Sequence, residues 1–208
     1  MTPNLRDIGH LPACDGRVVA PHRVLRSAVP AADDVGPEGL TWPPAVVIDL
    51  RSPGESEAVH PLAGHGARVV NLPLLSALRP GAAPVDTLHA LYLVMLDEAS
   101  AHLVELVREV GTASGTILIH CAAGKDRTGV SIALLLRLIG VPRRHVVDDY
   151  LLTAQAEQID GIGRKAESDC QQEPDIRRQN RPSRTIRLPC SEVAVYLRLA
   201  ANPRVAVI

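Results

Sequence analysis

The residue types with the most chemical potential lie in one short segment, residues 120–129, which reads HCAAGKDRTG. The Cys121 sulfur becomes a nucleophile once its thiol has lost a proton, and five residues separate it from Arg127. A guanidinium group can hold two oxygens of a phosphate at once. A nucleophile and a phosphate clamp at this spacing indicate covalent phosphoryl transfer, in which the cysteine takes up the phosphoryl group before water releases it.

The segments on either side of this loop are those that an anion site requires. Residues 116–120 form a short apolar run with β-branched residues, which predicts a buried strand. Residues 130–139 are apolar at most positions and predict a buried helix. Backbone amides in a tight loop and the positive end of the following helix both attract an anion. Gly124 permits the positive φ angle that such a loop needs.

These surroundings also favour the thiolate form of Cys121. Thr128 is placed to donate its hydroxyl to the sulfur, and His120 is expected to brace the loop and to influence the ionisation of the thiol. Arg127 and the amides of residues 122–127 would neutralise the phosphoryl oxygens. We therefore expect the chemistry to need no metal and no other cofactor.

Residues 45–50 (AVVIDL) predict a second strand buried on both faces, and Asp49 and Arg51 lie at its carboxyl end. Ligands of α/β sheets bind beyond the carboxyl ends of the strands, so both side chains are expected near Cys121. Asp49 and Arg51 either pair with each other, or Asp49 orients Arg127. We expect them to support the site rather than to act in catalysis.

The remaining pattern predicts an α/β fold in a single domain, residues 1–208, with a parallel or mixed central sheet flanked by helices on both faces. Residues 155–190 are polar and predict a loop, a lid or a flexible segment. The other predicted elements are a weaker strand at residues 69–72, two helices within 85–110 that break near 97–100, a helix from about residue 143, and a short helix around 193–197.

The net charge of −1 argues against a nucleic-acid-binding protein or a general membrane-surface binder, both of which are usually strongly basic. No apolar segment approaches the roughly 20 residues that span a bilayer, and the N-terminus lacks a signal sequence. We expect a cytoplasmic location and no integral membrane segment, while export by another route stays open. The composition is rich in Arg, Ala, Val and Pro, which indicates a GC-rich, bacterial genome. Lysine occurs only at positions 125 and 165, which sets Lys125 apart.

The other cysteines and the histidines give no metal-binding pattern. No C-x-x-C pair occurs, which argues against a zinc site and a disulfide framework. His60 and His65 flank a turn and are expected to be surface or capping histidines. A disulfide between an oxidised Cys121 and Cys14 or Cys170 is the alternative to inert structural thiols, and we expect inert thiols.

The segment HCAAGKDRTG resembles the phosphate-binding loop of protein tyrosine phosphatases, in the Gly-Lys-Asp-Arg form of the atypical bacterial tyrosine and dual-specificity phosphatases. The segments NLRDIG, VVIDLRSPGE, LYLVMLDEA and DDYLLT are also similar to that family, and the resemblance covers about residues 4–165. It implies a tyrosine phosphatase-like fold. It further implies that Cys121 is the nucleophile and Arg127 the phosphate clamp. The residues it implies for substrate binding are Ala122, Ala123, Gly124, Lys125 and Thr128.

The resemblance also bears on the general acid. Typical tyrosine phosphatases carry this acid in a separate Trp-Pro-Asp loop, whereas the single tryptophan here, Trp42, is followed by two prolines. In the Gly-Lys-Asp-Arg group the loop aspartate is the usual candidate, which is Asp126. A carboxyl group inside an anion site holds its proton more tightly, which suits this role. Asp49 and Asp97 are the reserve candidates.

These features predict a hydrolase that acts on phosphotyrosine, with possible activity on phosphoserine, phosphothreonine or phosphoinositides. A second cation, Lys125, beside Arg127 suits ligands with more than one phosphate, and inositol-lipid phosphatases are similar in this feature. The expected partner is thus a phosphorylated protein or a phosphoinositide, and the oligomeric state stays open. The alternatives are a rhodanese-type sulfurtransferase, whose cysteine loop needs no arginine at this position, and a non-catalytic protein that binds phosphorylated ligands.

Overall fold

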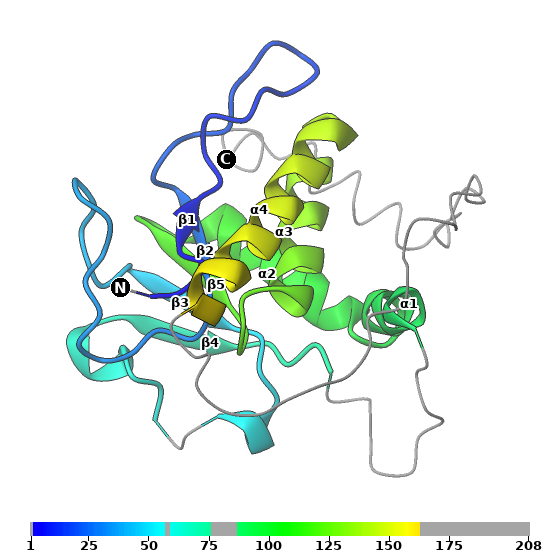
Figure 1. Cartoon of the computed structure of the whole chain (residues 1–208). Helices are drawn as coiled ribbons and strands as arrows, with labels where there is room; N and C mark the ends of the chain where they lie inside the picture. Colours follow the sequence, from blue (N-terminus) through cyan, green and yellow to red (C-terminus); the bar gives the residue numbers. More distant parts are fainter. Residues whose placement is uncertain (1, 57–58, 76–86, 163–208) are drawn as a thin grey trace.

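A computed structural model describes residues 2–56, 59–75 and 87–162 of the chain (Figure 1). Its sheet has five strands in the order β1-β2-β5-β3-β4. β1 runs antiparallel to β2, and the other neighbours are parallel, so the mixed form of the predicted sheet is confirmed. The strands are β1 (Arg6–Asp7), β2 (Val24–Ser27), β3 (Val46–Asp49), β4 (Arg68–Asn71) and β5 (Ile117–His120).

The two helices predicted within residues 85–110 are confirmed, and they meet at Ala99. The first of them begins after Thr87, whose side chain accepts a hydrogen bond from the Ala90 amide and so caps the helix. In Figure 1, α2, α3 and α4 run beside the sheet, and α1 lies at the edge of this group. The helices are α1 (Leu88–Glu98), α2 (Ser100–Thr112), α3 (Asp126–Leu138) and α4 (Arg143–Ile162).

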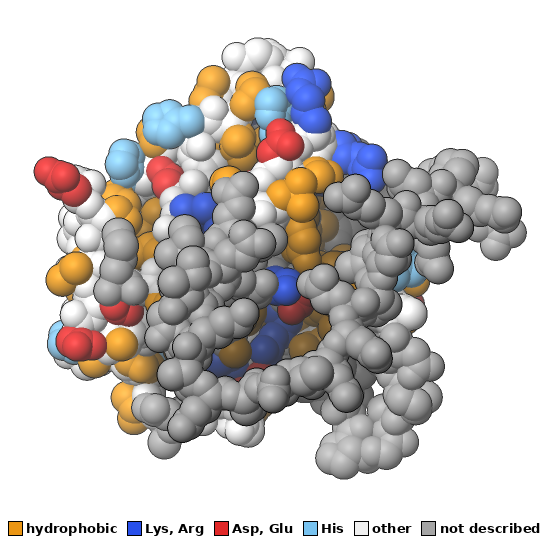
Figure 2. Space-filling model, in the orientation of Figure 1, with side chains coloured by type: hydrophobic (Ala, Val, Ile, Leu, Met, Phe, Trp, Pro, Cys, Tyr) orange, Lys and Arg blue, Asp and Glu red, His pale blue; other side chains and the backbone are white. Residues whose placement is uncertain are grey.

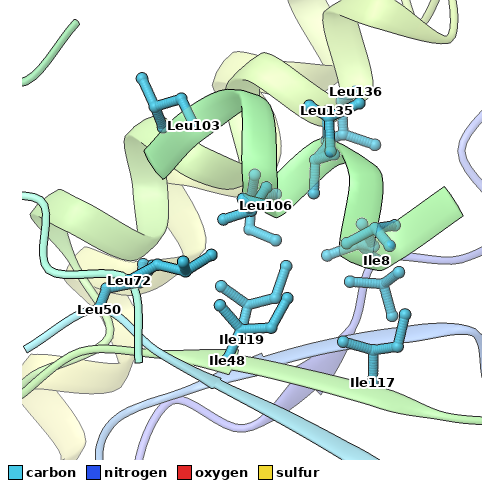
Figure 3. Close-up of a cluster of buried hydrophobic side chains, with 14 of the residues drawn as sticks. Ile8, Ile48, Leu50, Leu72, Leu103, Leu106, Ile117, Ile119, Leu135 and Leu136 are labelled. Carbon is cyan, nitrogen blue, oxygen red and sulfur yellow. The ribbon is translucent and has the colours of Figure 1, made fainter. Parts of the chain in front are cut away.

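One face of the sheet packs against the helices and forms the larger core. Because side chains alternate between the faces of a strand, Ile48 and Ile119 point to this side and meet leucines of α2 and α3 (Figure 3). The other face carries Val47 and Leu118, which pack against Leu62 and residues of irregular segments. Among the described residues, the helices contribute core side chains to the first face alone. The flanking helices of the prediction are confirmed, but within the described ranges they cover one face only; irregular segments on either side of the short 3₁₀ turn Ala63–His65 pack on the second face.

Two further boundaries differ from the sequence-based expectation. α3 begins at Asp126 rather than near residue 130, because the polar residues of its first turn belong to the loop motif and give no apolar periodicity. Residues 155–162 continue α4 rather than forming part of a loop or lid. The rest of the predicted lid, up to residue 190, and the short helix around 193–197 lie outside the described residues. None of the helices in the described ranges is long and apolar enough to cross a membrane.

Candidate active site

The loop between β5 and α3 starts at the edge where three parallel strands end. Ser27 of β2 and Asp49 of β3 both lie in register with His120, the last residue of β5. Cys121 therefore emerges from the middle of this edge, and its side chain is buried. Since α3 begins at Asp126, strand and helix are joined by a short loop whose residues all lie near the start of the helix.

The carbonyl groups in the first half of this loop are held from outside. The Cys121 carbonyl oxygen lies 3.0 Å from Nδ1 of His120, and that of Ala122 accepts a 3.0 Å hydrogen bond from the Val29 amide. In a trans peptide, a carbonyl and the N–H of the next residue point in opposite directions. The amides of Ala122 and Ala123 therefore point to the inner side of the loop.

The second half of the loop is held by the N-terminal segment and by β2. The Gly124 carbonyl oxygen accepts one hydrogen bond from Nη2 of Arg26 and one from Nδ2 of Asn4, both of 2.9 Å. The Lys125 amide consequently points inward, like the two amides of the first half. Several N–H groups that face one small region form a site for an anion.

Gly124 allows the backbone to make this turn. Its φ angle is +71°, a value that side chains other than glycine's resist. A Cβ atom at this position would lie 2.3 Å from the carbonyl oxygen of Ser27. The loop thus runs directly over the end of β2, and only glycine fits there.

Extra positive charge lies beneath the loop. The fully buried Arg26 places Nη1 2.5 Å from Asp149 of α4, and Arg6 binds the other oxygen of the same carboxylate at 2.9 Å. Burial lowers the pKa of Arg26, while Asp149 opposes that shift. Because two guanidinium groups share one carboxylate, a net positive charge remains close to the loop, which favours an anion on its other side.

Arg127 lies in the first turn of α3 and is held by Glu55. The Arg127 Nη1 and Nη2 atoms donate to the two oxygens of Glu55 at 2.6 and 2.8 Å. Glu55 ends the short turn that follows β3, and one of its oxygens also accepts a hydrogen bond from the Ser52 amide. The hydrogen bond from Arg127 is the main reason why the pKa of Glu55 is lowered. Glu55 therefore fixes the direction of the guanidinium group.

The contact with Glu55 uses one edge of the guanidinium group. A guanidinium group has five N–H donors. A carboxylate that binds both terminal nitrogens leaves a second edge, formed by Nε–H and an outer Nη–H, available to another ligand. Burial by itself would lower the pKa of Arg127, but Glu55 and the Cys121 side chain raise it above its usual value. Arg127 is thus charged, oriented and close to Cys121, with a second donor edge for two oxygens of a ligand.

Asp126, the first residue of α3, is held by two tyrosines. The Tyr92 hydroxyl on α1 lies 2.7 Å from Oδ1 of Asp126 and 2.6 Å from the Tyr150 hydroxyl on α4. The ring of Tyr150 packs on Gly129, where an added Cβ would lie 2.8 Å from the ring. Three helices therefore meet at the carboxyl group of Asp126.

The two reserve candidates for the acid are placed differently. Asp49 is buried and forms an ion pair with Arg51, whose Nη2 lies 2.8 Å from Oδ2 and whose Nε lies 3.0 Å from Oδ1. The carboxylate that orients Arg127 is that of Glu55, so the suggestion that Asp49 does so is wrong. Asp97 is exposed on α1, and among the described residues it forms no hydrogen bond or ion pair with the loop.

His120 belongs to a chain of hydrogen bonds whose directions can be assigned. The Leu62 amide donates to Nδ1 of His60 at 3.1 Å, so a neutral His60 carries its proton on Nε2. That proton points to Nε2 of His120, 2.9 Å away, and His120 then donates from Nδ1 to the Cys121 carbonyl. Burial is the main cause of a lowered pKa in both histidines. The pKa of His60 falls below its usual value, and that of His120 falls to about 4. Both rings are therefore neutral.

His60 thus differs in part from the sequence-based expectation. His60 caps a turn by accepting a hydrogen bond from the Leu62 amide, which fits the expected capping role. It is buried, however, and is not a surface histidine. His65 is exposed, as expected.

Asp49, His60 and His120 also bring one potential metal ligand each within 4.8 Å of one another. A metal would need the lone pair on Nε2 of both histidines, whereas the Leu62 amide keeps the proton of His60 on that atom. Arg51 already donates to both oxygens of Asp49, from Nε to Oδ1 and from Nη2 to Oδ2. These donors therefore fit a hydrogen-bond chain better than a metal site.

The two remaining candidate residues flank Arg127 in different ways. Lys125 is half-buried at the N-cap position of α3. Thr128 is fully buried, and its hydroxyl has no hydrogen-bond partner among the described residues. The structure therefore does not show the expected hydrogen bond from Thr128 to the Cys121 sulfur.

The supporting residues that sequence reasoning missed come from segments that resemble the family. VVIDLRSPGE contains Glu55, LYLVMLDEA contains Tyr92, and DDYLLT contains Asp149 and Tyr150. Each of these segments places at least one side chain against a residue of the site or against a residue that holds the loop. Figure 2 shows basic and acidic side chains next to each other near the centre of the visible face.

This fold and site define an α/β protein in which a buried cysteine and an oriented arginine lie at the two ends of a short loop between a strand and a helix. The sequence pattern of the tyrosine phosphatase family matches residues 1–199, beyond the range 4–165 expected from the motifs. The chain belongs to the tyrosine phosphatase family.

Three relatives support this assignment. A provisionally named tyrosine-protein phosphatase of Cupriavidus necator is 35% identical over 171 residues, which cover 73% of this chain and 60% of that protein. A tyrosine-protein phosphatase of Nostoc commune is 36% identical over 70 residues, or 33% of this chain and 24% of that protein. The triple specificity protein phosphatase PtpB of Mycobacterium tuberculosis is 54% identical over 35 residues, which cover 17% of this chain and 13% of that protein. The chain therefore spans at most 60% of the length of these relatives.

The neutral histidine pair predicts a loss of stability in mild acid. The unfolded chain takes up protons on these histidines below about pH 6.5, whereas folded His120 does so only near pH 4. The free energy of unfolding should therefore fall as the pH drops from about 7 to 5, with His120 contributing on the order of 2 kcal/mol. Urea denaturation at a series of pH values measures this.

A pair of variants isolates the contribution of His120. His120→Gln removes the buried titrating ring and should flatten the pH dependence between pH 7 and 5. His65→Gln changes an exposed histidine and should keep the wild-type slope. An unchanged slope in His120→Gln would show that His120 is not the source of the acid sensitivity.

Proposed function

We propose that the protein is a cysteine-dependent phosphomonoester hydrolase that acts on phosphotyrosine, and also on phosphoserine, phosphothreonine or phosphoinositides. The observation that carries the proposal is the convergence of Cys121, the oriented Arg127 and the inward-facing loop amides at one point. Membership of the tyrosine phosphatase family supports the same conclusion.

The proposed reaction has two displacements. The Cys121 thiolate attacks the phosphorus in line with the leaving oxygen, and a sulfur–phosphorus bond forms as the phosphorus–oxygen bond breaks. Asp126 gives its proton to the leaving oxygen. Water then attacks the phosphocysteine while Asp126 takes back a proton, and the sulfur leaves as a thiolate. Throughout, the loop amides and the second edge of Arg127 hold the three remaining phosphoryl oxygens.

Two features support the proposed breadth of substrates. Lys125 next to the phosphate clamp offers a second cation, which suits a ligand with more than one phosphate. The name of the Mycobacterium tuberculosis relative describes a triple specificity protein phosphatase, and the match to it is local. We therefore extend the proposal to phosphorylated serine, threonine and inositol lipids as well as tyrosine.

The nucleophile gives the first test. Replacing Cys121 with serine should lower the hydrolysis of phosphotyrosine peptides by roughly 1,000-fold or more, because the hydroxyl is a much poorer nucleophile at neutral pH. Binding of phosphate or vanadate should persist, since the loop amides and Arg127 are unchanged. A phosphate-release assay and calorimetry measure the two effects.

Two outcomes would contradict the proposal. Full activity in Cys121→Ser would rule out the cysteine as the nucleophile. Phosphate binding by the wild-type protein without hydrolysis of phosphopeptides or phosphoinositides would indicate a binding protein instead. A thiosulfate assay on the same preparation checks for the sulfurtransferase reaction, whose cysteine loop has no need of the Arg127–Glu55 pair.

The general acid gives the second test. Asp126→Asn should lower kcat/KM about 100-fold or more for an alkyl phosphate, whose leaving group needs a proton. The loss for p-nitrophenyl phosphate should be much smaller, because its leaving group departs without one. Asp49→Asn serves as the comparison. If Asp49→Asn shows this dependence on the leaving group and Asp126→Asn does not, the assignment of the acid is wrong.

A further inference from the structure

The two tyrosines beside Asp126 are the basis for an inference that rests on the proposed function. The Tyr92 hydroxyl lies 2.7 Å from Oδ1 of Asp126 and 2.6 Å from the Tyr150 hydroxyl, and all three side chains come from different helices. These distances are typical of hydrogen bonds between oxygens. The three groups therefore form a continuous chain that ends on the carboxyl group of the proposed acid.

Counting protons assigns a direction to this chain. Each phenol has one hydrogen to donate. When Asp126 is ionised, it can only accept, so Tyr92 must donate to Oδ1. The hydrogen bond between the two phenols then requires Tyr150 to donate to the Tyr92 oxygen. The order is Tyr150 to Tyr92 to Asp126, and Tyr92 has no hydrogen left for any other acceptor.

This arrangement distinguishes the two oxygens of Asp126. Oδ1 is engaged by Tyr92, which fixes the rotation of the carboxyl group and leaves Oδ2 as the oxygen that can carry a transferable proton. A general acid must hold its proton within hydrogen-bond reach of the leaving oxygen. A carboxyl group that rotated freely would present either oxygen, and either proton position, to the substrate.

We propose that Tyr92 is a positioning residue for the reaction, which holds Oδ1 of Asp126 and so directs the proton on Oδ2 to the leaving group. Tyr150 acts one step further out by holding the Tyr92 hydroxyl. Burial is the main cause that raises the pKa of Tyr92, followed by its hydrogen bonds to Tyr150 and Asp126, so the phenol keeps its proton.

The position of Tyr150 explains why the chain is well defined. Its ring packs against Gly129 in the second turn of α3, where a side chain would collide with it. Its neighbour in sequence, Asp149, binds both Arg6 and Arg26. α4 is therefore anchored on one side of the loop by Asp149 and reaches the proposed acid on the other side through Tyr150 and Tyr92.

The test uses conservative variants and leaving groups of different quality. Tyr92→Phe removes only the hydroxyl and should lower kcat/KM about tenfold for an alkyl phosphate, but less than about twofold for p-nitrophenyl phosphate. Tyr150→Phe keeps the hydrogen bond from Tyr92 to Asp126 and should show a smaller effect of the same kind. Thermal denaturation of each variant checks that the fold is retained.

A double-mutant comparison separates positioning from a general structural role. In an Asp126→Asn background, Tyr92→Phe should cause no further leaving-group-dependent loss, because there is no acid left to position. If Tyr92→Phe slows good and poor leaving groups equally, or acts independently of Asp126→Asn, the inference is overturned while the proposed function stands. If Asp126→Asn has no dependence on the leaving group, the inference fails together with the acid assignment. A wild-type protein that hydrolyses no phosphomonoester would instead overturn the proposed function.

Discussion

An anion site made of backbone amides requires that the carbonyl groups of the same peptides be held on the outside. In this protein, three of the four groups that meet this requirement come from distant parts of the sequence. His120 holds the Cys121 carbonyl, the Val29 amide holds the Ala122 carbonyl, and Arg26 and Asn4 hold the Gly124 carbonyl. Without these bonds, the peptides of a loop containing glycine could rotate and turn acceptors toward the ligand. The proposed binding of an anion above Cys121 thus depends on polar contacts behind the loop.

The side chains proposed to act in the site are themselves held by a second set of residues. Glu55 orients Arg127, and Tyr92 holds Asp126. Asp149 and Tyr150 are neighbours on α4. Asp149 binds Arg26, which holds the loop, and Tyr150 contacts Tyr92, which holds Asp126. A group whose donors are fixed before the ligand arrives needs little reorganisation during the reaction. This gives a physical reason why segments far from the cysteine loop resemble those of the family.

Much of the fold and the centre of the site could be predicted from the sequence because the signals are local. The apolar runs that became β3 and β5, the helical spacing of α1 and α2, and the interval between Cys121 and Arg127 all lie within a few residues. The partners Glu55, Tyr92 and His60 could not be predicted, since their contacts depend on the order of strands in the sheet and on how α1 packs against α3. The apolar periodicity of α3 begins only near Val130, because the first turn of the helix is polar.

The central claim is that the loop amides and Arg127 form one preorganised phosphate site in front of residue 121. A crystal structure of the Cys121→Ser protein with phosphate tests this most directly. The account predicts a phosphate whose oxygens accept hydrogen bonds from the amides of residues 122–127 and from the Nε edge of Arg127, with Glu55 still bound to that arginine. A phosphate that binds away from the loop, or that displaces Glu55 from Arg127, would contradict it.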